Sequence, residues 1–76
     1  MKTLEEIKAE IKKAVENDED ASVYAYRKSD NFRLPVVEIL GDTDTTENYI
    51  EEMEIETNKL TEFSKWEIAG YEIEID

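Results

Sequence analysis

Carboxylates are the main chemical groups of this chain. Its 76 residues include 21 Asp and Glu against nine Lys and Arg, and they contain no His and no Cys. The usual general base near neutral pH and the usual thiol nucleophile are therefore both missing. Paired carboxylates can hydrolyse glycosides, but one of them must be kept protonated by an apolar pocket, and so short a chain has little room for a cleft beside its core. We expect a binding protein that is not an enzyme and has no cofactor.

The segment Asp42-Thr43-Asp44 begins like an EF-hand calcium loop, with carboxylates at the first and third positions. The sixth and twelfth positions of that template are Glu47 and Met53 here, where a Gly and a bidentate Glu are required. A polar turn explains this segment better, and we expect no specific metal site.

Two tyrosines, Tyr24 and Tyr26, stand close to three basic residues, Arg27, Lys28 and Arg33. Aromatic and basic side chains together can form a platform for single-stranded nucleic acid. The net charge of −12 opposes this interpretation, because phosphate binding depends on a high density of cations. Packing within a sheet explains the tyrosines better, and we expect no direct binding of nucleic acid.

The negative charge is concentrated in the second half of the chain. Residues 41–76 have twelve acids and two lysines, a net charge of −10, whereas residues 1–20 sum to −3 and residues 21–40 to +1. Such a field repels DNA, RNA and anionic membranes and steers basic partners toward one surface. The expected partner is a basic protein surface, most simply that of a nucleic-acid-binding protein.

Length and composition predict one acidic domain over residues 1–76. Seven aromatic residues and regularly spaced Ile, Leu and Val argue against a disordered acidic tail. No Cys points to an oxidising compartment, and no apolar run approaches the length of a signal peptide or a membrane span. We therefore expect a cytoplasmic protein, in the host cytoplasm if a phage encodes it.

An amphipathic helix is predicted over residues 3–16. Thr3 and Glu6 have the spacing of a capping box, and the polar tract 17–20 ends the helix. The apolar residues between them repeat with helical spacing: Leu4, Ile7, Ile11, Ala14 and Val15.

Residues 21–27 and 32–40 are predicted to form two strands joined by a hairpin loop, because both are rich in Val, Ile, Tyr and Phe. Pro35 cannot donate a ladder hydrogen bond. The second strand is therefore expected either to lie at a sheet edge or to begin at Val36.

Residues 45–64 fit two patterns. Apolar residues such as Tyr49 and Met53 suit a helix capped near Thr45, but a helical stripe would turn Glu56 and Thr57 inward. The alternation of apolar residues and glutamates from residue 52 to residue 57 suits a half-buried strand with a turn at residues 58–59. We slightly favour the strand.

Residues 66–76 are predicted to form a strand with a β-bulge. Trp66 and Ile68 occupy even positions, whereas the later apolar residues occupy odd ones, so the buried phase slips by one residue at Ala69-Gly70. Together these elements predict an α+β fold, with an N-terminal amphipathic helix packed on an antiparallel sheet of about three to five strands.

If both acidic segments are strands, each presents a row of carboxylates on one face. The rows are Glu52, Glu54 and Glu56 in one strand and Glu72, Glu74 and Asp76 in the other. Alternate strand residues lie about 6.6–6.8 Å apart, and one DNA strand carries a charge about every 3.4 Å, so two adjacent rows match one strand of DNA. The predicted partner-binding residues are Glu47, Glu51, Glu52, Glu54, Glu56, Glu67, Glu72, Glu74 and Asp76.

In size, acidity, lack of Cys and His, and an N-terminal helix followed by acidic strands, the whole chain resembles small phage-encoded inhibitors that mimic DNA. Anti-CRISPR proteins and the uracil-DNA glycosylase inhibitor are of this type. The resemblance implies a stoichiometric inhibitor that occupies a basic nucleic-acid channel. The alternative is a small acidic protein–protein interaction module, or a phage or bacterial protein without mimicry, whose carboxylates are only a solvated surface.

Overall fold

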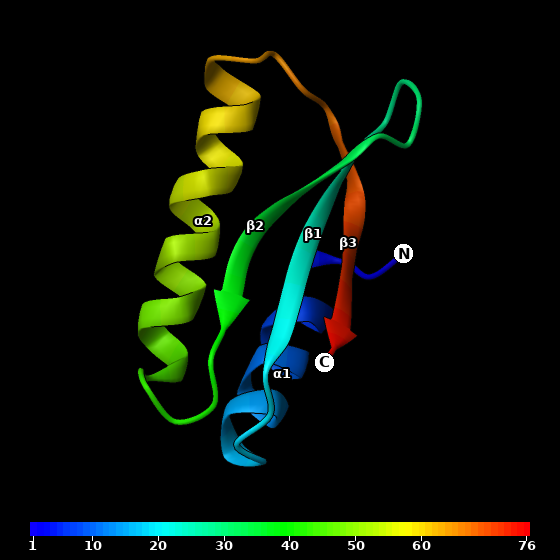
Figure 1. The fold of residues 1–76 in the computed structure, drawn as a ribbon. Coiled ribbons are helices and arrows are strands. Elements are labelled where there is room, and N and C mark those ends of the chain that lie inside the picture. The colour runs from blue at the N-terminus through cyan, green and yellow to red at the C-terminus, as the bar shows by residue number, and fades with distance from the viewer.

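In the computed structural model, which describes all 76 residues, two helices pack on one face of a three-stranded antiparallel sheet (Figure 1). The fold is therefore α+β, with the N-terminal helix packed against the sheet, as the sequence predicts. The elements in chain order are α1 (Leu4–Glu16), β1 (Ala21–Arg27), β2 (Arg33–Ile39), α2 (Thr46–Glu62) and β3 (Ile68–Ile75).

Helix α1 begins at the predicted capping box. The Thr3 backbone N–H donates to the Glu6 carboxylate at 3.0 Å, and the Glu6 N–H donates to the Thr3 hydroxyl at 3.2 Å. The hydrogen bond from the Thr3 backbone N–H to the carboxylate, helped by the Thr3 side chain, holds the pKa of Glu6 below its ordinary value. The buried face of α1 consists of Ile7, Ile11 and Ala14, so the predicted apolar stripe is confirmed.

Strand β1 is central, and the sheet order is β2-β1-β3. Its residues Ala21, Val23 and Ala25 are buried beneath the helices, while the alternate residues face the opposite side of the sheet. Strand β2 is an edge strand, so the edge position expected for a strand containing Pro35 is confirmed. Its register with β1 shifts so that Val36 is an extra residue, and both Val36 and Val37 are buried.

Strand β3 contains the predicted bulge. Tyr26 pairs with Gly70 and Arg27 pairs with Ile68, so Ala69 is the extra residue. The strand begins at Ile68 rather than at Trp66, which is buried in the preceding linker.

Residues 46–62 form helix α2, so the favoured interpretation of this segment as a strand is wrong. The Thr45 hydroxyl caps the helix by accepting from the Asn48 N–H at 3.2 Å. Tyr49 and Met53 are buried, whereas Ile55 points outward, as it must two positions, or about 200°, further round a helix. The apparent alternation around Met53 thus arises from residues on opposite sides of α2.

Thr57 faces inward on α2, and its hydroxyl is buried without a hydrogen-bond partner. Replacing Thr57 by Val should therefore stabilise the protein by about 1 kcal/mol, because an unsatisfied buried hydroxyl is destabilising. We expect the melting temperature to rise by about 4–8 °C. Thr61→Val is the matched control and should bring no gain, since the Thr61 hydroxyl donates to the Asn58 carbonyl at 3.1 Å. An equal gain in both variants would show that burial of Thr57 is not the cause.

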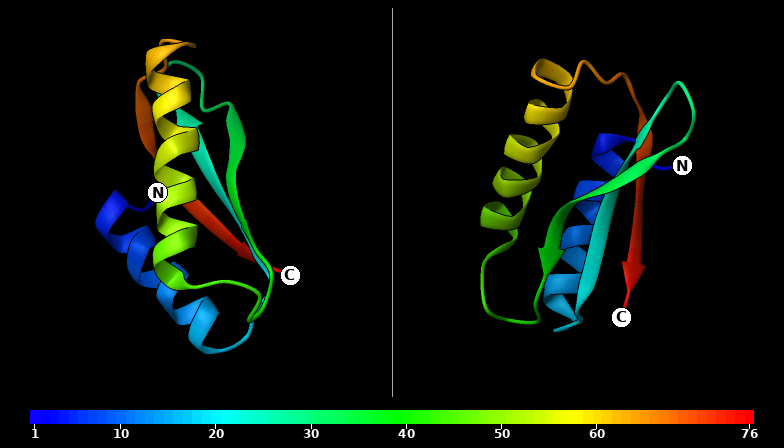
Figure 2. Two further views of the ribbon diagram at one scale, coloured as in Figure 1. Left: turned by 90° about the vertical axis from the view of Figure 1, so that its left-hand side faces the viewer. Right: turned by 45° about the horizontal axis from the view of Figure 1, so that its top comes forward.

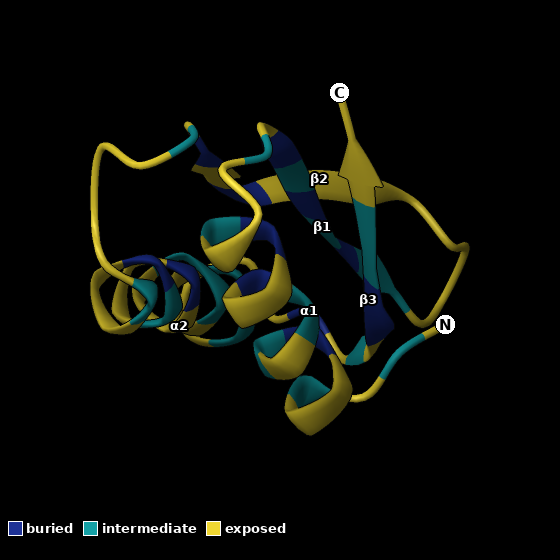
Figure 3. Ribbon diagram, turned by 90° about the horizontal axis from the view of Figure 1, so that it is seen from below, coloured by how far each residue is buried: buried dark blue, intermediate teal, exposed yellow.

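Both helices lie on the same side of the sheet (Figures 2 and 3). Helix α2 packs mainly on β2, while α1 lies nearer to β3 and contacts α2. The core forms between the layers and includes Ile7, Ile11, Val23, Ile39 and Met53, none of which is accessible to solvent. The other face of the sheet has no helix on it. Neither helix is long and apolar enough to cross a membrane.

Candidate partner-binding surfaces

Five of the predicted partner-binding residues lie on α2, where a helix distributes them differently from a strand. Because each residue turns the helix by about 100°, Glu52, Glu54 and Glu56 do not form one row. Glu51 instead lies one turn after Glu47, and Glu56 one turn after Glu52. The first predicted row of carboxylates is therefore wrong.

Several carboxylates of α2 have cationic neighbours. The Glu54 carboxylate lies 3.9 Å from the ammonium of Lys8 on α1, and that of Glu56 lies 3.0 Å from Lys59. Glu47, Glu51 and Glu52 are exposed and have no ion pair. Glu62, which the sequence analysis did not select, is also exposed on α2. We call the exposed carboxylates Glu47, Glu51, Glu52 and Glu62 the helix surface.

Glu72 and Glu74 share the helix-free face of the sheet, as predicted. Glu72 pairs with Tyr24 of β1 and Glu74 with Ser22, while Asp76 lies beyond the end of β3. Arg33 reaches across β1 from β2, with its guanidinium 4.0 Å from the centre of the Tyr24 ring, and forms an ion pair with Glu74. Arg33 thus neutralises part of this face, and Tyr24 packs across the strands, as expected.

The acidic residues therefore form two separate groups. The helix surface lies beside β2 on the helix-covered face, whereas Glu72 and Glu74 lie on the opposite face, at the far edge of the sheet (Figure 1). The predicted geometry, with two adjacent carboxylate rows on neighbouring strands, does not occur. The physical reason is that residues 46–62 are helical and cover the sheet instead of joining it.

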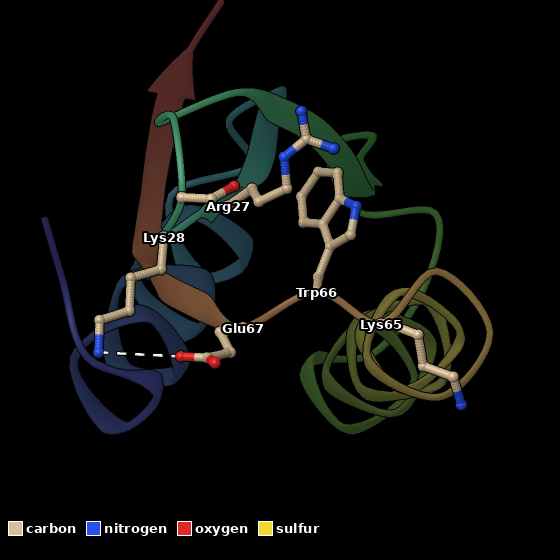
Figure 4. Close-up of a pocket in the computed structure, with 6 residues that line it drawn as sticks. Arg27, Lys28, Lys65, Trp66 and Glu67 are labelled. Atoms are coloured by element: carbon tan, nitrogen blue, oxygen red, sulfur yellow. Dashed lines mark ion pairs between the residues drawn. The ribbon is translucent and has the colours of Figure 1, made fainter.

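Glu67 belongs to neither group, because it lies in the α2–β3 linker beside basic residues. Its carboxylate is 3.9 Å from the Lys28 ammonium, across a pocket of about 280 Å³ (Figure 4). In Figure 4 the side chains of Lys28 and Lys65 point away from each other. The ammonium groups of this pocket therefore do not converge on one point, as a site for a single small anion requires.

The guanidinium of Arg27 is held firmly at the same end of the molecule. It lies 5.2 Å from the ring centre of Phe32 and 5.1 Å from that of Trp66, and it donates two hydrogen bonds to Asp30, at 2.8 and 2.6 Å. These bonds lower the pKa of Asp30 to about 2. This basic end joins the β1–β2 hairpin to the linker. Its sequence signals were the net charge of +1 over residues 21–40 and the cluster of Arg27, Lys28 and Arg33 near two tyrosines.

The loop that resembles the start of an EF-hand caps α2. The Asp44 carboxylate accepts from the Asn48 side-chain amide at 2.7 Å and from the Thr45 N–H at 2.8 Å, which lowers the pKa of Asp44. No three acidic side chains lie together in an arrangement that could hold a metal ion.

No protein-family model matches the chain, and no curated protein or solved structure matches it. The assignment of a function therefore depends on the charge and geometry of the surfaces.

Proposed function

We propose that this protein binds, without catalysis, a basic surface of a nucleic-acid-binding protein and inhibits it by occupying the place of the nucleic acid. This is the mode of action implied by the resemblance to DNA-mimicking phage inhibitors of the anti-CRISPR type. The helix surface of α2 is the proposed contact. A single helix takes the role that the sequence analysis gave to two strands.

The density of carboxylates along α2 supports this proposal most directly. Six acids and only one lysine lie within its 17 residues. From Glu47 to Glu62 the helix rises about 22 Å, which gives one carboxylate about every 4.5 Å for all six acids and about every 7.5 Å for the four of the helix surface, against about 3.4 Å for the charges of one DNA strand. A basic groove therefore meets on α2 a concentration of negative charge that is distributed around the helix and is less dense than that of a nucleic-acid strand.

The carboxylates of the helix surface are suited to electrostatic binding. Glu47, Glu51 and Glu52 are exposed and form no ion pair within the protein, although Glu47 shares a depression with Lys8 and Lys12 of α1. A basic surface that binds these glutamates gives up its own counterions, as it does on binding DNA. The affinity of such a complex should fall steeply as the salt concentration rises.

Glu47→Gln, Glu51→Gln and Glu52→Gln combined should weaken binding to the basic partner by about tenfold or more, since each exposed pair contributes up to about 1 kcal/mol. The matched control combines Glu10→Gln and Glu16→Gln on α1 with Glu38→Gln on β2, which removes the same charge away from the helix surface. Immobilised protein is exposed to nuclease-treated extract, and the proteins retained are eluted with a DNA oligonucleotide at constant ionic strength. Purified retained proteins then give the dissociation constants. Equal weakening by both triple variants, or no elution by DNA, contradicts mimicry at α2.

One observation favours the second candidate, a protein–protein interaction module without mimicry. Ile55 is 49% exposed on the outward face of α2, in a shallow depression that it shares with Glu51, Glu52 and Glu56. An apolar side chain at the centre of a polar surface is typical of protein interfaces and has no counterpart in a phosphate backbone. Such a module should lose its partner on Ile55→Ser and should not be displaced by DNA.

A further inference from the structure

The outer edge of β3 is already paired at one point, by an isolated antiparallel bridge between Lys2 and Tyr71. The Lys2 N–H donates to the Tyr71 carbonyl at 2.8 Å, and the Tyr71 N–H donates to the Lys2 carbonyl at 2.9 Å. Gly70 makes room for the N-terminal segment, because a Cβ atom there would lie 2.8 Å from the Cβ of Met1. The edge thus accepts main-chain pairing at Tyr71.

The rest of the edge is open. Since both backbone groups of Tyr71 point away from β1, the alternation of an antiparallel ladder makes those of Ile73 and Ile75 point outward as well. The next residue, Asp76, confirms the alternation, because its N–H points back toward the chain of β1 and donates to the Asp20 carbonyl at 2.8 Å. No strand lies beyond Ile73 and Ile75, so their N–H and C=O groups are free to pair.

We infer that this open edge, from Ile73 to Ile75, binds an extended segment of a basic partner as an additional antiparallel strand. The inference rests on the proposed function only in taking the partner to be basic, and it uses β3 instead of the helix surface. Main-chain hydrogen bonds supply affinity in this kind of recognition, and alternate side chains supply specificity.

The side chains of β3 define the sequence that fits. Glu72 and Glu74 lie on the helix-free face, beside the Met1 α-ammonium and the Arg33 guanidinium respectively, and the net charge of −12 favours Lys or Arg at the partner positions on this face. The α-ammonium of Met1, 3.4 Å from the Glu72 carboxylate, shows that a cation can lie there. On the other face Ile73 is half-buried and Ile75 is 48% exposed, which favours apolar partner residues. The segment should therefore alternate cationic and apolar residues.

Other edges and occupants fit less well. The outer edge of β2 is interrupted by Pro35, which has no N–H, and by the extra residue Val36. A second copy paired through its own β3 would place Glu72 and Glu74 opposite further glutamates, and like charges directly opposite are destabilising. Two copies that each carry a net charge of −12 also repel each other, so charge disfavours self-pairing and favours a basic segment.

The test uses the full chain, labelled with ¹⁵N, and the synthetic peptide acetyl-Lys-Val-Lys-Val-Lys-Val-Lys-amide. At saturating peptide the amide exchange of Ile73 and Ile75 should slow by about tenfold or more, the change expected for newly formed main-chain hydrogen bonds of at least about 1.4 kcal/mol. The amides of Glu72 and Glu74, already paired with β1, should change little. Binding of the peptide without protection of Ile73 and Ile75 would overturn the inference.

Methylated peptides separate main-chain pairing from charge without changing the protein. Peptide valines should lie opposite Ile73 and Ile75 and should exchange both hydrogen bonds with them, as Lys2 does with Tyr71. N-methylation of the valines should abolish protection, whereas N-methylation of the lysines, whose N–H groups point away, should preserve it. Equal effects of the two methylated peptides would also overturn the inference.

The proposed function is tested separately by the helix-surface variant. The combined Glu47→Gln, Glu51→Gln and Glu52→Gln changes should leave peptide protection at β3 intact, because those residues lie on the other side of the sheet. If this variant also retained full affinity for the basic partner, the proposed function would fail while the edge inference stood.

Discussion

Ile11→Ala should destabilise the protein by about 2–5 kcal/mol, a range typical of removing a large aliphatic side chain from a packed core. Ile11 is completely buried on α1 and belongs to the core between the helices and the sheet. A domain of this size has a small core, so a loss of this magnitude should leave a large fraction of the variant unfolded at 25 °C. Urea denaturation followed by far-UV circular dichroism measures the free energy of unfolding.

Lys12→Ala is the control, since it changes the next residue on the exposed side of α1 and should shift stability by no more than about 0.5 kcal/mol. Ile7→Ala, at the other completely buried isoleucine of α1, should behave like Ile11→Ala. Unchanged unfolding curves for both isoleucine variants would mean that α1 is not docked on the sheet.

The stability of the protein should pass through a maximum at about pH 4–5, where the carboxylates begin to be protonated. Between pH 7 and this maximum, protonation reduces the net charge of −12 and with it the repulsion within the folded state. Added salt at pH 7 should stabilise the protein for the same reason. Thermal unfolding between pH 2 and pH 7, at low and moderate salt, measures both effects. A melting temperature independent of salt at pH 7 would contradict this explanation.

Below the maximum, three carboxylates with lowered pKa values should reverse the trend. They are Glu6, Asp30 and Asp44. A group whose folded pKa lies below its unfolded pKa stabilises the folded state above the unfolded value, and this contribution is lost as the pH falls through the folded value. For Asp30 that window runs from its ordinary value of 3.8 down to about 2.

Asp30→Asn should therefore lower stability near neutral pH and make the decline below pH 4 shallower. An unchanged acid limb in this variant would show that the Arg27–Asp30 pair does not stabilise the fold.

Local patterns in the sequence were sufficient to predict α1, β1 and the bulge in β3. The capping box of Thr3 and Glu6, the alternation around Val23 and the phase slip at Ala69 all act over a few residues, and the structure contains each of them. The same local reasoning gave the wrong structure for residues 46–62. Glutamates disfavour strands and are compatible with helices, and this propensity should have outweighed a short alternation that includes only Met53, Ile55 and Thr57.

The arrangement of the acidic residues could not be predicted from spacing alone. Composition showed where along the chain the charge lies, but the distance between Glu52 and Glu72 depends on which face of the sheet α2 covers. That choice is made by burial of Tyr49 and Met53 against residues distant in sequence. Arg33 reaching Glu74 across β1 is likewise a tertiary contact, and it leaves no periodic signal in the sequence.

The bridge between Lys2 and Tyr71 also affects how the chain folds. It joins residues 69 positions apart, and closing a loop of that length costs about 1.7 kcal/mol more entropy than closing one of about ten residues. The β1–β2 hairpin and both helices are local structures and can form earlier, whereas β3 must find the far side of β1 after α2 has been made. During synthesis β1 therefore has one unpaired edge until residues 68–75 emerge, and in that interval the nascent chain is most exposed to misassociation.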